Sequence, residues 1–198
     1  MKVYLIRHGQ SEANLNKMHA GWSDTPLTPL GESQARCTRP LIEGIEFSKI
    51  YVSDLIRARK TAEIIFGGKD MEFSKALREI NMEKISNTPY SELERMYGST
   101  YIECRKKWDF SPLGCESVSS FMARTGSFFD ALERNSAELE NVAIVAHAGI
   151  IRSLAHRVIG IDFADRYTMK IDNASVSVLE YLHESGWRIL HWNYTPQL

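Results

Sequence analysis

Short runs of hydrophobic residues alternate along the chain with segments in which hydrophobic positions recur every three or four residues. The runs predict β-strands, and the segments of helical spacing predict helices between them. Residues 142–146 are apolar at every position, which is typical of a strand that is covered on both faces. Strands are expected at residues 2–6, 49–52, 71–73, 142–146, 176–182 and 187–192, with the last two forming a hairpin.

Helical spacing recurs in four segments. One of them begins with Thr28 and Pro29, a residue type that caps helices followed by proline at the first helical position. The helices are expected over residues 29–42, 55–65, 118–132 and 149–159. Strands that alternate with helices in this way indicate an α/β protein, here a three-layer α/β/α sandwich whose central sheet is mostly parallel.

The pattern breaks into polar and aromatic pieces between residues 81 and 115. We expect this stretch to form a helical excursion that lies over the rest of the fold as a lid. No internal repeat, low-complexity tract or linker divides the chain, and 198 residues suffice for one sizeable hydrophobic core. The sequence therefore predicts a single domain over residues 1–198, with the lid inserted at roughly 81–115.

The charges of the chain nearly cancel, with 24 Lys and Arg against 25 Asp and Glu. Nucleic-acid binding needs a clustered basic excess, so no nucleic-acid partner is expected. No apolar run approaches the ~18 residues of a membrane helix, and the N-terminal run is too short for a signal peptide. The three cysteines form no C-x-x-C pair, which argues against disulfides and structural zinc. We expect a cytoplasmic protein without a membrane partner, and its oligomeric state stays open.

Two predicted strands run directly into histidines, the first into Arg7 and His8 and the fourth into His147. If these strands are parallel neighbours, both imidazoles lie beyond the carboxyl ends of the strands, where ligands bind in open α/β sheets. Each histidine is followed by small residues and a predicted helix start, which would direct backbone N–H groups toward an anion. Arg7 adds a planar guanidinium that matches the oxygens of a phosphate.

This combination favours phosphoryl transfer. A neutral imidazole beside arginine is a competent nucleophile toward the phosphorus of a bound phosphate. The second histidine could donate a hydrogen bond to another phosphate oxygen. Because charged side chains would neutralise the oxygens, neither a metal ion nor an organic cofactor is expected.

Four short motifs extend the candidate site along the chain. They are residues 7–14 (Arg-His-Gly-Gln-Ser-Glu-Ala-Asn), 53–62 (Ser-Asp-Leu-Ile-Arg-Ala-Arg-Lys-Thr-Ala), 77–79 (Leu-Arg-Glu) and 146–149 (Ala-His-Ala-Gly). Each motif alone is weak evidence, but the four in this order are strong. The chain resembles the histidine phosphatase superfamily, the phosphoglycerate-mutase-like group, over nearly its whole length.

The resemblance implies roles for particular residues. His8 would accept the phosphoryl group. Glu79 would protonate the leaving oxygen and later activate the water that cleaves the phosphohistidine. Three further side chains would line the phosphate pocket: Arg7, Arg57 and His147. The substrate would also be bound by Asn14 and by the backbone amides of Ala148 and Gly149.

Local patterns alone predict other environments for some polar residues. At ~100° per residue, Arg57 lies well off the apolar stripe of its helix, which predicts a solvated side chain. Glu79 has no local pattern, and nearby Glu83 is a rival for its role. His156 lies opposite the apolar stripe of its helix and is expected at the surface.

The lid sequence combines basic and aromatic residues. Its basic cluster is expected to form a solvated face, although it could contact a second anionic group of a substrate: Arg105, Lys106 and Lys107. Its aromatic residues are expected to pack within the lid: Tyr90, Tyr97, Tyr101 and Trp108. Outside the candidate site, three histidines have no partners at metal-ligand spacing: His19, His183 and His191.

Within the family the resemblance leaves phosphatase and mutase activities open. The mutases typically carry Glu-Arg-His-Tyr-Gly at the general acid, whereas Glu79 is followed by Ile-Asn-Met-Glu. We therefore expect a metal-independent phosphomonoesterase that hydrolyses a small phosphorylated metabolite through a phosphohistidine. The alternatives are a cofactor-dependent phosphoglycerate mutase and an α-ribazole phosphatase of cobalamin assembly, and a non-enzymatic interaction domain is the least favoured.

Overall fold

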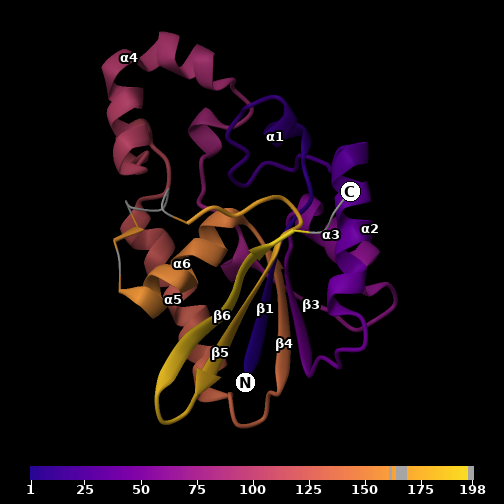
Figure 1. Cartoon of the computed structure of the whole chain (residues 1–198). Coiled ribbons are helices and arrows are strands. Elements are labelled where there is room, and N and C mark those ends of the chain that lie inside the picture. Colours follow the sequence, from indigo (N-terminus) through magenta and orange to yellow (C-terminus); the bar gives the residue numbers. More distant parts are fainter. Residues whose placement is uncertain (161, 164–168, 196–198) are drawn as a thin grey trace.

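The computed structural model describes residues 1–160, 162–163 and 169–195. Its centre is a six-stranded sheet in the order β3-β2-β4-β1-β5-β6 (Figure 1). The strands are β1 (Lys2–Arg7), β2 (Lys49–Ser53), β3 (Glu72–Ser74), β4 (Asn141–Ala146), β5 (Val176–Leu182) and β6 (Gly186–Tyr194). The first four in chain order run parallel to one another, whereas β5 and β6 form the predicted antiparallel hairpin. The six predicted strands are confirmed.

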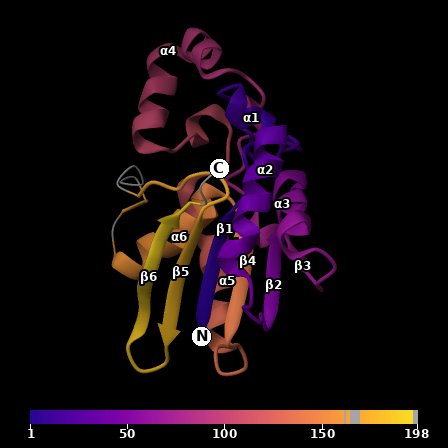
Figure 2. The same ribbon diagram turned by 45° about the vertical axis from the view of Figure 1, so that its right-hand side comes forward.

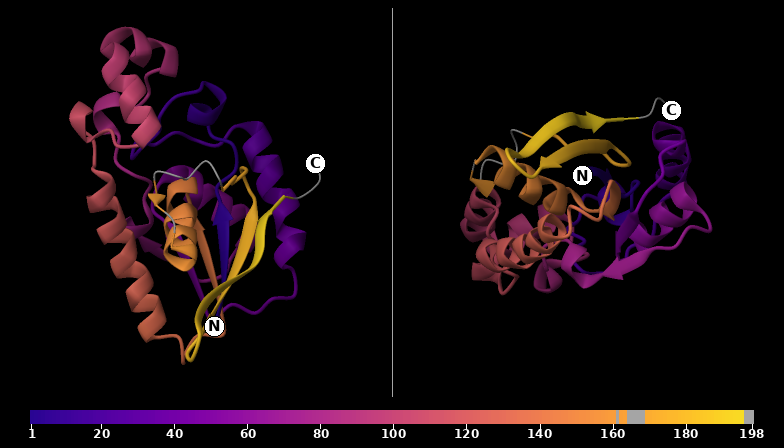
Figure 3. Two further views of the ribbon diagram at one scale, coloured as in Figure 1. Left: turned by 60° about the vertical axis from the view of Figure 1, so that its left-hand side comes forward. Right: turned by 90° about the horizontal axis from the view of Figure 1, so that it is seen from below.

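The helices are α1 (Glu12–Leu15), α2 (Pro29–Thr38), α3 (Ile56–Phe66), α4 (Tyr90–Lys107), α5 (Val118–Arg134) and α6 (Ala148–Ile159). Short 3-10 turns lie at Arg39–Ile42, Lys75–Leu77, Glu83–Ile85 and Ser111–Leu113. Helices α2 and α3 cover one face of the sheet, and α5 and α6 cover the other (Figures 2 and 3). This arrangement is the predicted α/β/α sandwich. None of the described helices is long and apolar enough to cross a membrane.

The central strand β4 contributes to the hydrophobic core on both sides of the sheet. Val142 and Ile144 belong to the core beneath α5 and α6, whereas Ala143 and Val145 belong to the core beneath α2 and α3. Residues 142–146 are 0% exposed. The prediction that this apolar run is covered on both faces is confirmed, and each large aliphatic side chain buried there contributes about 1.5–3 kcal/mol to stability.

Helix α2 begins as its sequence predicts. The Thr28 side-chain oxygen accepts a hydrogen bond from the Gly31 N–H at 3.1 Å, and Pro29 occupies the first helical position. The cap satisfies one of the backbone donors that every helix start leaves without a partner, and such a cap contributes about 1 kcal/mol. The cap also fixes the position of α2 beside the loop that follows β1. This position contributes to the geometry of the candidate site.

The prediction that His156 lies at the surface is wrong, because its side chain is 2% exposed. The imidazole packs against Phe163 with ring centroids 5.3 Å apart. Phe163 in turn contacts Phe121 of α5 at 5.6 Å. Helix α6 therefore has two buried sides, one facing the sheet and one facing α5. A single apolar stripe in the sequence predicts only the side that faces the sheet.

Helix α4 and its flanking turns lie beyond the carboxyl ends of β1 and β4 (Figure 1). Gly98 interrupts α4 with φ 52° and ψ −129°, a conformation that glycine adopts readily and L side chains avoid. The helix changes direction there, and an ion pair of 2.7 Å between Arg105 and Glu94 joins its two parts. The assignment of this segment as a lid inserted in a single domain stays a prediction.

Candidate active site

The two predicted histidines lie side by side at one edge of the sheet. In the parallel β1–β4 pair, Arg7 lies opposite Ala146, so the next residue of each strand, His8 and His147, emerges at the same edge. Their ring centroids are 5.1 Å apart, and the ring planes are inclined by 60°. Both side chains are buried, at 4% and 1% exposure.

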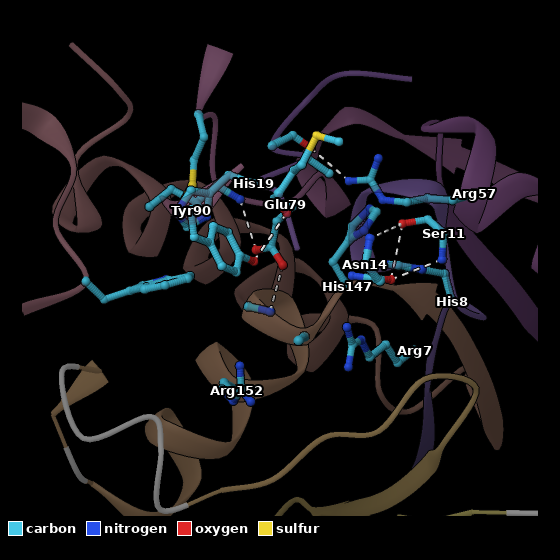
Figure 4. Close-up of a pocket in the computed structure, with 18 of the residues that line it drawn as sticks. Arg7, His8, Ser11, Asn14, His19, Arg57, Glu79, Tyr90, His147 and Arg152 are labelled. Carbon is cyan, nitrogen blue, oxygen red and sulfur yellow. Dashed lines mark hydrogen bonds between the residues drawn. The ribbon is translucent and has the colours of Figure 1, made fainter. Parts of the chain in front are cut away.

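A pocket of about 170 Å³ lies at this edge (Figure 4). It is lined by all eight residues that the sequence predicts for the site: Arg7, His8, Asn14, Arg57, Glu79, His147, Ala148 and Gly149. The rival acid Glu83 is exposed and does not line the pocket. The structure therefore brings together residues that are up to 142 positions apart along the chain.

His8 has a defined tautomer. Its Nδ1 lies 2.7 Å from the carbonyl oxygen of Gly9, and a carbonyl only accepts hydrogen bonds, so Nδ1 carries a proton. Burial, together with the positive charges of Arg57 and Arg7, holds the pKa of His8 well below its usual 6.5. The ring is therefore neutral at pH 7, and Nε2 has a lone pair available for attack on an electrophile.

The backbone around His8 is held by direct contact with the start of α2. A Cβ built on Gly9 would lie 2.2 Å from the carbonyl oxygen of Gly31. A Cβ built on Gly31 would lie 2.0 Å from the carbonyl oxygen of Gln10. The Gly9 N–H donates to Thr61 Oγ1 at 3.1 Å. Two glycines thus allow the two backbones to touch, and this contact sets the position of His8.

Arg57 is 1% exposed, in contrast to the solvated side chain that helical periodicity alone predicts. Its Nη1 and Nη2 donate to the carbonyl oxygens of Ser23 at 2.9 Å and Gly21 at 2.8 Å. Periodicity fails here because Arg57 lies in the first turn of α3, where the loop at residues 21–23 covers the side of the helix turned away from the sheet. Arg57 lines the pocket, the position that the family resemblance implies.

Arg7 and Arg57 both have an ε-nitrogen without a partner among the described residues. Arg7 Nη1 donates to the Ile171 carbonyl at 2.6 Å. The Nε atoms of both arginines are buried and have no hydrogen-bond partner within the described residues. Burial lowers the pKa of each guanidinium to about 10, which still leaves both protonated at neutral pH. The pocket therefore contains two positive charges with unused donors.

His147 is the residue that precedes α6, and its imidazole contacts β2. Its Nε2 lies 2.8 Å from Ser53 Oγ, and the Leu55 N–H donates weakly to the same hydroxyl at 3.5 Å. Its Nδ1 is buried, with no hydrogen-bond partner in the part of the chain that the structure describes. Burial and the charge of Arg57 lower the pKa of His147 well below 6.5. It is neutral at pH 7, like His8.

Glu79 reaches the pocket from the irregular segment after β3 and bonds to the start of α6. Its Oε2 accepts from the Gly149 N–H at 3.0 Å, and its Oε1 accepts from the Ile80 N–H at 3.0 Å. A negative carboxylate is stabilised at a helix N-terminus. A Cβ built on Gly149 would lie only 2.0 Å from Glu79 Oε1, so this contact depends on glycine. The Gly149 amide, predicted to bind the substrate, thus bonds to Glu79 in this structure.

Asn14 lies at the far side of the pocket from Glu79 (Figure 4). Its Oδ1 accepts from the Ser11 N–H at 3.1 Å, from the Ser11 hydroxyl at 3.1 Å and from Asn173 Nδ2 at 3.2 Å. These bonds occupy the oxygen, and the Asn14 amide nitrogen is the group with donor capacity toward a bound anion. The placement of Asn14 in the pocket agrees with its predicted role.

Sequence reasoning did not identify three other residues of the site. Ser53 contacts His147 as described, Asn173 Nδ2 also donates to the His8 carbonyl at 3.1 Å, and Arg152 lines the pocket one turn after Gly149. Ser53 ends a parallel strand beside β4, a position that could have indicated it. Asn173 lies in an irregular segment, and no pattern in the sequence marks it.

The outer wall of the pocket is largely apolar and aromatic. Its residues come from α4, from the loop after α1 and from the segment before α4: Met18, His19, Ile80, Met82, Tyr90 and Trp108. His19 is 6% exposed, and its Nε2 lies 2.9 Å from the Tyr101 hydroxyl. Its ring packs among four aromatic rings at 4.7–6.0 Å. The aromatic residues of the lid thus pack together as predicted, and the structure adds a buried histidine, His19, to this cluster.

The basic residues of the lid do not line the pocket. Arg105 pairs with Glu94 at 2.7 Å, and Lys106 pairs with Glu103 at 2.7 Å. Lys106 and Lys107 are exposed, in agreement with the expected solvated face, whereas Arg105 is half-buried and its guanidinium lies 5.8 Å from the Tyr90 ring and 5.9 Å from the Tyr101 ring. Among the described residues there is also no group of three or more His, Cys, Asp or Glu side chains placed to hold a metal ion.

Buried His19 is expected to make the fold less stable at mildly acidic pH. Burial and the charge of Arg105 lower its pKa from 6.5 to about 4. The unfolded chain binds a proton below pH 6.5 that the folded chain does not, so this stability is complete above pH 6.5 and is lost as the pH falls toward 4. At 1.36 kcal/mol per pH unit, the loss from this residue approaches about 3 kcal/mol.

Urea unfolding at pH 7.5, 6 and 5 measures this dependence. His19→Gln keeps a polar side chain beside Tyr101 but does not titrate, and its stability should fall less steeply between pH 6 and 5 than that of the wild type. His183 is exposed, and His183→Gln should keep the wild-type slope. An unchanged slope in His19→Gln would contradict the assignment.

Comparison with known proteins agrees with this geometry. The family model of the histidine phosphatase superfamily (branch 1) matches residues 3–195. An adenosylcobalamin/α-ribazole phosphatase of Salmonella typhimurium is 26% identical over 183 residues, covering 91% of this chain and 90% of the relative. A 2,3-bisphosphoglycerate-dependent phosphoglycerate mutase of Methylocella silvestris is 31% identical over 162 residues, covering 77% of this chain and 78% of the relative.

The fold is also shared with solved structures. The crystal structure of the α-ribazole phosphatase from Shigella flexneri superposes with a TM-score of 0.89 at 23% identity, covering 100% of this chain and 99% of that one. The family match and the phosphatases among the relatives support a hydrolase that acts on phosphate monoesters. With the family model matched over almost every residue, this chain belongs to the histidine phosphatase superfamily.

Proposed function

We propose that this protein hydrolyses small phosphomonoesters through a phosphohistidine formed on Nε2 of His8. One observation carries the proposal. His8 lines a pocket together with three side chains that each have a buried nitrogen without a partner within the described residues: Arg7 (Nε), Arg57 (Nε) and His147 (Nδ1). Buried polar groups without partners are rare in folded proteins. A phosphoryl group has the charge and the oxygen acceptors to satisfy all three.

In the first step, His8 Nε2 attacks phosphorus opposite the leaving oxygen. The N–P bond forms as the P–O bond to the leaving group breaks. Glu79 in its protonated form donates a proton to the leaving oxygen, so that an alcohol departs rather than an alkoxide. The Nδ1–H···O=C bond to Gly9 keeps the His8 ring oriented while Nε2 is phosphorylated.

In the second step, the ionised Glu79 takes a proton from a water molecule. The water oxygen attacks phosphorus, the N–P bond breaks, and its electron pair returns to Nε2. Inorganic phosphate leaves, with His8 again neutral and Glu79 again protonated. One carboxyl group thus serves as acid and then as base, and the cycle regenerates the starting enzyme.

Charge stabilisation comes from the arginines and the second histidine. Both guanidinium groups are protonated at neutral pH and can donate to the equatorial oxygens of the transferred group. If the Ser53 hydroxyl donates to Nε2 of His147, the proton of neutral His147 is on Nδ1 and can be donated to a third oxygen. Ser53 then acts as the group that selects this tautomer.

The organic part of the substrate would lie against the apolar wall of Met18, Tyr90 and Trp108. Arg105 and Lys106 of the lid are paired with Glu94 and Glu103, and neither they nor Lys107 line the pocket, so the lid offers little for a second acidic group. This favours a monoester with one phosphate, including an α-ribazole phosphate, over the phosphoglycerates on which a mutase acts. The departure from the mutase motif after Glu79 supports the same choice.

A panel of phosphomonoesters tests the proposal. We expect release of inorganic phosphate from substrates such as ribose 5-phosphate, nucleoside monophosphates and α-ribazole 5′-phosphate. We expect no 2-phosphoglycerate from 3-phosphoglycerate, even with 2,3-bisphosphoglycerate added, as followed by ³¹P NMR. Dominant isomerisation of 3-phosphoglycerate would replace the phosphatase assignment with a mutase, and the absence of activity on every ester would remove the enzymatic assignment altogether.

A further inference from the structure

The proposed acid–base residue, Glu79, is on a segment with little regular structure of its own. The segment follows β3, contains only the 3-10 turn Lys75–Leu77, and leads into the outer wall of the pocket. A proton donor must be placed to within a fraction of an ångström of the leaving oxygen. Something outside the segment therefore has to hold its backbone.

Arg124 of α5 supplies most of this support. Its Nη1 donates to the carbonyl oxygens of Ala76 and Arg78, both at 2.9 Å. Its Nη2 donates to the carbonyl oxygen of Glu79 itself at 3.3 Å. One rigid guanidinium thus bonds three carbonyls within four residues, including that of the proposed acid, and its planar arrangement of donors suits this task better than a lysine.

Glu116 completes the contact from the other side. Its carboxylate accepts from Arg124 Nε at 3.2 Å and Nη2 at 3.0 Å. It also accepts from the backbone N–H of Asn81 at 2.8 Å. The two side chains are only 20% and 12% exposed. A buried ion pair of this kind is stable only when further hydrogen bonds satisfy both partners, and here those further bonds all go to the Glu79 segment.

Trp22 binds the same carbonyl from a third direction. Its Nε1–H donates to the Glu79 oxygen at 2.7 Å. Its ring lies 4.8 Å from the Arg78 guanidinium and 5.8 Å from that of Arg124, within the range of cation–π contacts. The main-chain oxygen of Glu79 therefore has two donors, while its carboxylate extends toward Gly149 in the pocket.

We infer that Arg124, Glu116 and Trp22 are positioning residues that place Glu79 for proton transfer. None of the three touches the reacting atoms. Their removal should therefore affect only the steps in which Glu79 gives or takes a proton. The inference rests on the function proposed above, and it predicts a dependence on the leaving group that a general loss of structure would not produce.

The test compares two esters with Arg124→Lys. In a reaction through a phosphoenzyme, kcat/KM reports only the steps up to phosphorylation of His8. For an alkyl ester such as glycerol 2-phosphate, whose leaving oxygen needs a proton, we expect kcat/KM to fall at least about ten-fold, since general acid catalysis contributes ~10²–10⁴-fold. For 2,4-dinitrophenyl phosphate, whose leaving group needs no proton, kcat/KM should change by less than about three-fold.

Matched variants separate positioning from folding. Arg157 joins α6 to Asp130 and Glu133 of α5 at 2.6 and 2.9 Å, so Arg157→Lys alters an ion pair on the same helix away from the Glu79 segment. It should leave both kcat/KM values unchanged. Trp22→Phe keeps an aromatic ring and removes one donor to Glu79, and it should show the same selective loss as Arg124→Lys even if that variant folds poorly.

The outcomes are distinct. An equal loss for both esters in Arg124→Lys and in Trp22→Phe overturns the inference while leaving the phosphatase in place. A further loss when Arg124→Lys is added to Glu79→Gln also overturns it, because a residue that acts through Glu79 has no effect once the acid is gone. Failure of the wild-type protein to turn over either ester counts against the proposed function instead.

Discussion

Replacing His8 with alanine is expected to abolish turnover while the fold is kept. The variant loses the imidazole whose Nε2 is the proposed nucleophile, so no covalent intermediate can form on residue 8. Loss of a nucleophile lowers kcat by on the order of 10⁴-fold or more. Base-quenched reactions with ³²P-labelled substrate should show label on the wild-type protein, removable by mild acid as phosphohistidine is, and none on His8→Ala.

The control for this experiment is a histidine at the surface. His191 of β6 is exposed, and His191→Ala should keep wild-type labelling and turnover. Thermal unfolding of His8→Ala should confirm that the protein is still folded. Retention of the acid-labile label in His8→Ala would show that a different nitrogen accepts the phosphoryl group, and the mechanism proposed for His8 would then be abandoned.

Replacing Gly149 with alanine is expected to lower kcat/KM for alkyl phosphates by roughly 10²- to 10⁴-fold, the range that general acid catalysis supplies. The added methyl group would lie 2.0 Å from Glu79 Oε1, so the carboxylate must move. The moving atom is the end of a flexible side chain, and Gly149 lies in the first turn of α6, where alanine is well accommodated. Stability should therefore change little while activity collapses.

Gly126 of α5 provides the matched control. It is also a helical glycine, but a Cβ there would meet no atom within 4 Å. Gly126→Ala should raise the free energy of unfolding by about 0.5–1 kcal/mol and leave kcat/KM unchanged. Urea unfolding and steady-state kinetics on both variants measure the contrast. Wild-type activity in Gly149→Ala would show that the position of the Glu79 carboxylate in this structure does not matter for catalysis.

The histidine pair could be predicted from sequence because it depends on regular structure. Parallel strands end at a common edge, and residues that directly follow two neighbouring strands must meet there. His8 and His147 follow β1 and β4, which pair in register, so their contact needed no knowledge of the loops. The same reasoning predicted the layers of the sandwich, because the all-apolar run of β4 requires cover on both faces.

The remaining contacts depend on irregular segments whose paths local patterns do not determine. Arg57 is buried by the loop at residues 21–23, which approaches α3 from more than thirty positions away. Motif resemblance alone brought Glu79 into the site, and the Gly149 amide that holds its carboxylate was expected to bind substrate. The prediction that His156 is exposed is wrong for a related reason. A helical wheel identifies a single buried face, whereas α6 has two.

The close packing of Gly9 against Gly31 has a consequence for how this enzyme can change. The position of the proposed nucleophile, His8, is set by backbone atoms that are already in contact, so no side-chain substitution at these glycines can adjust it slightly, and any larger residue would displace it. The apolar wall contributed by Met18, Tyr90 and Trp108 has no such restriction. Selection for new substrates, natural or in the laboratory, should therefore accumulate changes in that wall and leave the glycine contact untouched.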